Sequence, residues 1–396
     1  LEKRPKLRFP GFDEPWEHKE LLHYLVENTD RNKQLKFGKE NVLSVSGEYG
    51  IVNQIAFQGR SFAGESVADY HVVETDDIVY TKSPLKAKPY GIIKVNNGVP
   101  GIVSTLYAVY HPLKTVVPRF VDFYFSNDLR LNKFLKPLVN IGAKHDMKVN
   151  NTFVLTGMVV FPPLREQQKI VDFLTILDRR IDVQRKKVEA LKKYKRGLLN
   201  QIFSAISKGS QRRKLRELVH VSGGKTPSMS NSLYWNGDIV WISSKDMKSN
   251  RISDSELKIT NLALNEMTLY HPGTLLLVAR SGILKHSLPL AILEVDATIN
   301  QDIKALQVHG CNAFYLYYAI LSQEDNIIRT LVKTGTTVQS LMMDSFLNIE
   351  IPTPDIDRQQ STIDKLAKLE KYVDVQEKEL SLLSQMRNGL LQQLFI

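Results

Sequence analysis

The chain has 396 residues, of which 43% are hydrophobic and 24% charged, a balance typical of a soluble globular protein with two or three domains. It contains no apolar run of about eighteen residues, and its basic start, Leu1–Pro10, lacks the apolar core of a signal peptide, so we expect neither a transmembrane helix nor an export signal. The formal net charge of +11 favours a polyanionic partner such as nucleic acid, although solubility alone is the alternative explanation.

A single cysteine, Cys311, excludes an internal disulfide framework and a cysteine-based zinc cluster, and it fits a reducing cytoplasm. The nine histidines form no close ligand pair on a predicted helix face, so the sequence predicts no metal site.

The first domain is predicted over residues 1–162, where short β-branched segments alternate with Gly, Asn, Ser and Pro turns. We expect a mixed fold, mostly strand with a few helices. Basic residues gather in two predicted loops, one after the strand that begins at Asp77 and one after Gly142. Such loops suit the major groove of DNA, where Arg or Lys can pair with guanine, although each residue could instead have an ordinary surface role. The candidate DNA-binding residues of this half are Lys82, Ser83, Lys86, Lys88, Tyr90, Lys144 and Lys148.

A long helix is predicted over residues 163–203, directly after the strand end Phe161-Pro162-Pro163. It has no internal proline, and its apolar residues recur at alternating spacings of three and four, which is typical of a coiled-coil seam. It carries 11 Lys/Arg and 5 Asp/Glu, which indicates either a solvated face or contact with phosphate or an acidic partner. The seam residues are Leu174, Leu177, Ile181, Gln184, Val188, Leu191, Leu198 and Ile202.

A second mixed domain is predicted over residues 204–353, with Ser204–Arg213 as the linker that opens it. Arg280 and Lys285 occupy the loop that matches Lys82–Lys88 of the first half, and a polar run follows the predicted strand 239–242. The candidate DNA-binding residues of this half are Lys225, Ser243, Ser244, Lys245, Arg280, Lys285 and Thr336.

The helix predicted over residues 354–396 repeats the first one without gaps, from Gln359-Gln360, which matches Gln167-Gln168, through Phe395, which matches Phe203. A lone helix of this length is unstable, so we expect the two seams to pack on each other. Gln184 and Gln376 share one seam position, where a polar residue either fixes register or reaches solvent. The second seam consists of Leu366, Leu369, Val373, Gln376, Leu380, Leu383, Leu390 and Leu394.

Catalytic motifs are absent from the sequence. No Asn-Pro-Pro-aromatic, Gly-x-Ser-x-Gly or Gly-rich cofactor motif occurs. The run Gly223-Gly224-Lys225-Thr226 matches the end of a phosphate-binding loop, but Val219 replaces the glycine that such a loop requires. The sequence therefore favours a recognition or scaffold protein, with a coiled-coil adaptor that lacks a DNA role as the alternative.

This order of segments resembles the specificity subunits of bacterial Type I restriction–modification enzymes. The similarity is carried by residues 163–171 (PLREQQKIV), 196–203 (RGLLNQIF), 5–12 (PKLRFPGF) and Gly335-Thr336-Thr337, and it covers essentially the whole chain. One departure is the start of the second helix, residues 354–360 (PDIDRQQ), which is more acidic than the first.

The resemblance implies an α+β fold with two target-recognition domains, each followed by a long helix, and the two helices paired as an antiparallel coiled coil. Each domain would bind one part of a split, asymmetric DNA site, and the helices would set the gap. Two modification (methyltransferase) subunits and restriction subunits would assemble on the chain. S-adenosylmethionine, ATP and Mg are expected on those partners and none on this chain, which would not itself be an enzyme. A methylation-only system without a nuclease fits equally.

Overall fold

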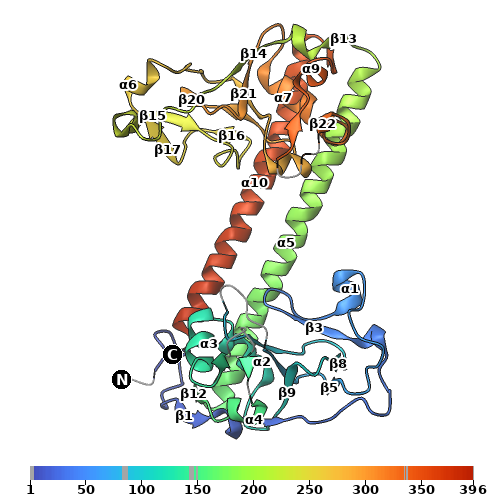
Figure 1. Cartoon of the computed structure of the whole chain (residues 1–396), viewed down its shortest axis with the longest axis vertical. Coiled ribbons are helices and arrows are strands. Elements are labelled where there is room, and N and C mark those ends of the chain that lie inside the picture. Colours follow the sequence, from blue (N-terminus) through green and yellow to red (C-terminus); the bar gives the residue numbers. More distant parts are fainter. Residues whose placement is uncertain are drawn as a thin grey trace. The chain divides into compact units, whose positions relative to one another are not determined.

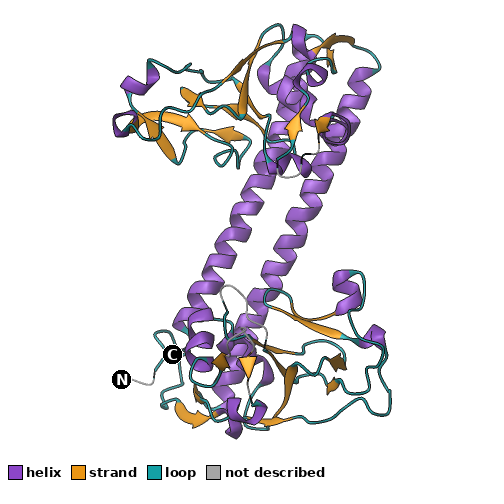
Figure 2. Cartoon of the chain, viewed as in Figure 1, coloured by secondary structure: helices purple, strands orange, loops and turns teal. Residues whose placement is uncertain are grey.

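The structure is a computed structural model that describes residues 4–82, 88–141, 147–148, 150–333, 335 and 338–395 (Figures 1 and 2). The chain divides into two compact units. Unit 1 comprises residues 1–185 and 378–396, and unit 2 comprises residues 186–377. Each unit contains one mixed domain and a part of each long helix, so each draws its residues from both predicted helices.

Unit 1 is built on a four-stranded antiparallel sheet in the order β2-β9-β6-β7, with α2 packed against it. Its strands are β1 (Glu17–Glu20), β2 (Leu25–Glu27), β3 (Leu43–Ser46), β4 (Gly50–Asn53), β5 (His71–Val73), β6 (Ile78–Thr81), β7 (Ile92–Val95), β8 (Gly101–Val103), β9 (Tyr107–Pro112), β10 (Asn140–Ile141), β11 (Met147–Lys148) and β12 (Met158–Phe161). Its short helices are η1 (Leu21–His23), η2 (Lys39–Asn41), α1 (Gln54–Gln58), α2 (Pro118–Phe125), α3 (Asp128–Leu135) and α4 (Asn151–Val154).

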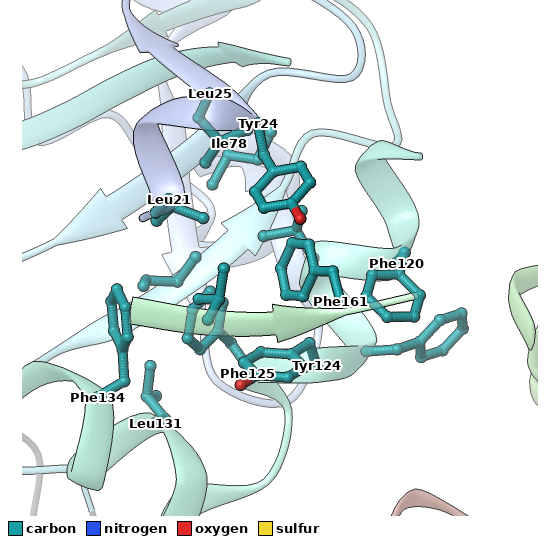
Figure 3. Close-up of a cluster of buried hydrophobic side chains, with 14 of the residues drawn as sticks. Leu21, Tyr24, Leu25, Ile78, Phe120, Tyr124, Phe125, Leu131, Phe134 and Phe161 are labelled. Atoms are coloured by element: carbon teal, nitrogen blue, oxygen red, sulfur yellow. The ribbon is translucent and has the colours of Figure 1, made fainter. Parts of the chain in front are cut away.

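Aromatic side chains form the centre of the unit 1 core (Figure 3). The Phe161 ring lies 4.7 Å from that of Tyr24 and 5.0 Å from that of Phe120, in tilted and edge-to-face arrangements that aromatic pairs favour. Because Phe161 is the last residue of β12, this cluster fixes the point at which the long helix α5 (Leu164–Ser207) leaves the domain.

Unit 2 contains a five-stranded sheet in the order β14-β21-β18-β19-β16 and a three-stranded sheet in the order β17-β15-β20. Strands β18 and β19 are buried along their whole length, which their unbroken apolar sequences require. The strands are β13 (Gln211–Lys214), β14 (Val219–Gly223), β15 (Trp235–Ile242), β16 (Arg251–Ile252), β17 (Leu257–Ile259), β18 (Leu275–Val278), β19 (Leu290–Leu293), β20 (Ala297–Ile299), β21 (Ile303–Val308), β22 (Val332–Lys333), β23 (Ser340–Leu341) and β24 (Glu350–Thr353). The short helices are η3 (Leu215–Glu217), η4 (Ser232–Tyr234), α6 (Asn261–Leu264), η5 (Gly282–Lys285), α7 (Ala313–Leu321), α8 (Glu324–Leu331) and α9 (Met343–Phe346).

The internal repeat of the sequence is also a repeat of structure. In each half, an opening strand pairs antiparallel with the strand just before the long helix, β1 with β12 and β13 with β24. The first glutamine of each Gln-Gln pair is buried and bonded to backbone. Gln167 Oε1 accepts from Val117 N (2.9 Å), and Gln359 Oε1 accepts from Asn312 N (2.9 Å). Val117 and Asn312 are the N-caps of α2 and α7, so the repeated glutamine ties each long helix to the same element of its domain.

The long helices are α5 (Leu164–Ser207) and α10 (Ile356–Gln393). They pair antiparallel within each unit. In unit 1, Asp178 and Arg180 of α5 meet Arg387 and Glu379 of α10, and in unit 2, Lys192 meets Glu377. The predicted α+β fold of two mixed domains and two antiparallel long helices is therefore confirmed.

The structure differs from the sequence-based prediction at one helix boundary and in the surroundings of three seam residues. Helix α5 continues to Ser207, so the first residues of the predicted linker Ser204–Arg213 are helical, because Ile206 extends the apolar stripe and is buried in the unit 2 core. Leu174 of α5 and Leu394, which directly follows α10, pack in the core of the unit 1 domain, and Leu366 of α10 packs in the core of unit 2, because each helix covers a domain at its end.

The seam residues differ in exposure. Buried are Leu174, Leu177, Ile181, Gln184, Val188, Leu366, Val373, Gln376, Leu383 and Leu394. Partly buried are Leu191, Leu198, Ile202, Leu369, Leu380 and Leu390. Leu383 packs against Leu177 and Ile181 in a small cluster of unit 1.

We predict that Leu383→Ala lowers the free energy of unfolding by about 2–3 kcal/mol, because it leaves a cavity against Leu177 and Ile181. The neighbouring Leu382 is 55% exposed, so Leu382→Ala should change that free energy by less than about 0.5 kcal/mol. Urea titrations followed by circular dichroism measure both. Equal effects of the two variants would show that this seam is not closed in solution.

Candidate nucleic-acid interface

The loop after β6 in unit 1 carries positive charge beside a buried histidine. Lys82 is half-buried, and its pKa lies below the usual value. Burial is the main cause; Glu27 partly offsets it, and the nearby Arg31 lowers the pKa further. Burial, then Arg31 and Lys82, lower the pKa of His71 to about 4. Two cations held near each other, Lys82 and Arg31, favour an anion between them. Arg31 was not among the candidates predicted from the sequence.

Other candidates in this loop already have partners. The Lys88 ammonium lies 3.1 Å from the Asp128 carboxylate of α3, and its side chain is only 15% exposed. Tyr90 packs against the unit 1 core, and its carbonyl accepts a hydrogen bond from the Tyr80 hydroxyl (2.7 Å). Ser83 and Lys86 lie outside the described residues. To bind DNA, Lys88 would have to leave Asp128, which makes it a weaker candidate than Lys82.

The second predicted loop of unit 1 is described only in part. Lys148 belongs to β11, where it pairs with Asn140 of β10, whereas Lys144 lies outside the described residues.

In unit 2, the polar run after β15 forms a pre-organised loop. The Asp246 carboxylate accepts from the Ser243 amide (2.8 Å) and hydroxyl (2.7 Å) through one oxygen, and from the Glu256 amide (2.9 Å) through the other. Ser243 is therefore committed to the turn, Ser244 is half-buried, and Lys245 is exposed. The sequence analysis missed Asp246, although Ser-x-x-Asp is a recognisable turn pattern.

Lys225 follows β14 at a point where two backbones almost touch. A Cβ on Gly224 would lie 2.0 Å from the Ile299 carbonyl oxygen, so only glycine fits. The Lys225 backbone N–H donates a hydrogen bond to that same carbonyl (3.0 Å). The Lys225 carbonyl accepts a hydrogen bond from Trp241 Nε1 (3.1 Å). Gly224 thus permits strand packing rather than phosphate binding, while the Lys225 side chain stays exposed.

Arg280 and Lys285 are exposed on the connection between β18 and β19. This connection packs against residues 339–341, since Ser281 N donates to Gln339 O (3.0 Å) and Leu341 N donates to Ala279 O (2.9 Å). Thr336, in the segment that leads there, is outside the described residues.

One turn, Ile299–Asp302, joins these three loops of unit 2. Ile299 O accepts from Lys225 N, Asn300 N donates to Ile242 O (2.9 Å) just before Ser243, and Asp302 O accepts from Ala279 N (2.8 Å) just before Arg280. At the tip of the turn lies the exposed Gln301, whose side-chain oxygen accepts a hydrogen bond from the Thr226 hydroxyl. A glutamine amide can pair with adenine, so Gln301 is a further candidate for DNA contact. The sequence pattern that could have indicated it is a polar run directly after a buried strand.

The cations around this turn have no ion-pair partner in the part of the chain that the structure describes. Among the described residues, no ion pair involves Lys225, Lys245, Arg280 or Lys285. Three loops with uncompensated positive charge, held by backbone hydrogen bonds to one turn, suit a polyanion.

In the ranges that the structure describes, no group of three or more His, Cys, Asp or Glu side chains could hold a metal ion. Burial raises the pKa of the Cys311 thiol to about 11, so this cysteine stays protonated near neutral pH. No helix within the described part of the chain is long and apolar enough to span a membrane.

Fold and loops together define a class of protein: two similar mixed domains, each followed by a long helix of an antiparallel pair. A family model described as the Type I restriction modification DNA specificity domain matches residues 64–193 and 207–385. Since these segments cover more than half of the chain and fall one in each half, the chain belongs to this family.

Two curated relatives carry related names. The specificity subunit of the Type I restriction enzyme EcoR124I/EcoR124II from Escherichia coli is 37% identical over 160 residues, which are 39% of this chain and 40% of that protein. The MjaIX specificity subunit from Methanocaldococcus jannaschii is 29% identical over 190 residues, which are 46% of this chain and 43% of that protein. The matches thus span about two fifths of these relatives.

Solved structures share the fold over nearly the whole chain. The S subunit of a Type I restriction–modification system from M. genitalium has a TM-score of 0.61 at 14% identity, with 99% of both chains covered. A chain from a structure described as the basis of complex assembly and conformational transition of the type I R-M system has a TM-score of 0.56 at 16% identity, again with 99% of both covered.

We predict that unit 1 loses stability below neutral pH because of His71. Its folded pKa of about 4 lies below the ordinary value of 6.5, so protonation favours the unfolded chain. The contribution of the neutral His71 side chain to the free energy of unfolding is complete above about pH 6.5 and is lost as pH falls towards 4. The loss amounts to at most about 3 kcal/mol. Urea titrations at several pH values measure it.

The control is His71→Leu, which keeps a side chain of similar size without a titrating group. The His71 Nδ1 is buried without a hydrogen-bond partner among the described residues, so leucine loses only the hydrogen bond of His71 with the Asn28 backbone. The pH slope between 6.5 and 4 should be shallower in this variant, and identical slopes would contradict the assignment.

Proposed function

We propose that this chain is the DNA sequence-recognition subunit of a Type I restriction–modification complex and binds a bipartite, asymmetric DNA site. The observation that carries the proposal is the meeting of three cation-bearing loops at the turn Ile299–Asp302, in a chain of the DNA specificity family. Lys225 and Lys245 would bind phosphates, whereas Arg280 and Gln301 have the side chains that pair with guanine and adenine in the major groove. Lys82 and Arg31 would bind the other half of the site in unit 1.

The proposed partners are two modification (methyltransferase) subunits, restriction subunits and double-stranded DNA in the bacterial cytoplasm. The relatives are named as specificity subunits of restriction enzymes, which supports this assembly. S-adenosylmethionine, ATP and Mg would be bound by the partners, and this chain would supply recognition rather than catalysis. A methylation-only complex would use the same recognition.

The test is to co-express the chain with the modification subunit encoded beside it, in a host without other DNA methylation, and to sequence methyladenine directly. A methylated split motif with a fixed gap, absent when this chain is omitted, is the expected result. Soluble subunits without any methylated motif would instead favour an adaptor without a DNA role.

A loop variant sharpens this test. Lys245→Ala with Arg280→Ala should lower methylation at the second half-site about ten- to a hundredfold and relax its base preference, while the first half-site keeps its sequence. The control, Lys258→Ala, removes one charge that is already paired with Asp254 (3.1 Å), so it should leave the motif unchanged. An unchanged motif in the loop variant would remove these residues from the interface.

We further propose that α5 and α10, which both units share, set the gap between the half-sites. Deletion of residues 182–188 and 374–380 removes one heptad at matching positions and keeps the seam pattern. Seven helical residues span about 10 Å, so the gap should shorten by roughly three base pairs while both half-site sequences persist. Methyladenine sequencing measures this, and an unchanged gap would refute the idea.

A further inference from the structure

A buried carboxylate in unit 2 connects the helix pair with the loop after β15. Glu370 lies on α10 and is 6% exposed. One carboxylate oxygen accepts from the Lys195 ammonium of α5 and from the Asn250 side-chain amide (2.8 Å), and the other accepts from the Tyr318 hydroxyl of α7 (2.9 Å). Two helices and one loop thus converge on a single side chain of α10.

The ion pair with Lys195 belongs to the repeat, but the bond to Asn250 does not. At the equivalent repeat position of unit 1, Asp178 pairs with Arg387, which matches Lys195, and with Arg119 of α2 (3.6 Å). Both helical carboxylates therefore neutralise the cation of the opposite helix. Only in unit 2, as far as the described residues go, does the carboxylate also hold a loop that follows a strand.

Asn250 is the last residue of the recognition loop, defined here as residues 243–250. The loop is fixed at its start by the Ser243–Asp246 turn and in its middle by Met247, which is buried in the core beside β15. At its end, the Asn250 carbonyl accepts from Ile292 N of β19 (2.8 Å), while the Asn250 side chain reaches Glu370. The last of these bonds joins the loop to the helix pair.

Charge compensation does not require Asn250. A buried carboxylate is costly unless it is paired and hydrogen-bonded, and Lys195 and Tyr318 already supply a cation and a buried donor. The amide of Asn250 contributes a directed bond that restricts where the loop ends. The exposed Lys245 and Lys248 lie on the segment so restricted.

We propose that Asn250 and Glu370 are positioning residues, which orient the recognition loop on the helix pair and so tune the base preference at the second half-site. This rests on the proposed function, because it takes the loop to be a DNA contact. The pair acts through Lys245 and its neighbours and touches no base itself.

Two variants that each remove one hydrogen bond from the same carboxylate make the test. Asn250→Ala removes the loop tether, and Tyr318→Phe removes the bond from α7. Each complex with the modification subunit is offered a mixture of DNA substrates with single mismatches in either half-site, and methylation of each is counted by sequencing. Unfolding temperatures are measured in parallel.

With Asn250→Ala, discrimination against mismatches in the second half-site should fall about tenfold, whereas discrimination in the first half-site stays at the wild-type level. Tyr318→Phe should lower the unfolding temperature by a similar amount and leave both half-sites unchanged. Asn250→Ser, which is too short to reach Glu370, should behave as Asn250→Ala and serves if the alanine variant does not fold.

The proposal is overturned if Asn250→Ala and Tyr318→Phe discriminate alike, because the bond to the loop would then have only a structural role. Failure of the proposed function looks different: the wild-type complex itself would show no preference for either half-site, and the positioning role would fall with it.

Discussion

Neither domain of this chain can close its core without residues from a long helix that ends on it. In unit 1, the ring of Phe395, two residues after α10, lies 5.4 Å from that of Phe120 and 6.5 Å from that of Trp16. In unit 2, the matching Phe203 near the end of α5 lies 5.4 Å from Tyr315. Burial of apolar surface is the main favourable contribution to folding. In each unit, the domain and its part of the helix pair must therefore fold together.

Buried polar bonds then determine how each helix meets its domain. The glutamines Gln167 and Gln359 satisfy backbone groups at the starts of α2 and α7, and they also donate to Pro162 and Pro354. In unit 1, Arg8 donates to both carboxylate oxygens of Glu166 (2.8 and 2.7 Å), which is fully buried at the start of α5. Repeated sequence motifs therefore correspond to places where unpaired polar groups would be costly.

The sequence was most informative where the physics is local or periodic. Proline-flanked starts, the absence of internal proline and the alternating spacing of apolar residues predicted α5 and α10 to within a few residues. The gap-free repeat from Gln167 to Phe203 predicted that both halves share one architecture, and the opening and closing strands of each half bear this out.

The candidate site was harder to predict because it depends on contacts between distant segments. Composition nominated Lys88 and Lys245 alike. In the structure, Asp128, forty residues away in the chain, pairs with Lys88, whereas Lys245 is exposed. Likewise, the residues next to Gln301 in the sequence do not indicate that residues 225, 242 and 279 bind its turn through backbone hydrogen bonds. Long-range backbone bonds of this kind leave no periodic trace in a sequence.

That turn has an evolutionary consequence. Three loops of unit 2 are fastened to Ile299–Asp302 through main-chain groups, which any residue except proline can supply. Side chains at the loop tips can then be substituted, because each substitution changes an exposed side chain without disturbing the backbone hydrogen bonds to the turn. An insertion or deletion inside the turn would displace all three loops together. Diversity should therefore accumulate by substitution and by loop-tip length changes, with the length of the turn held constant.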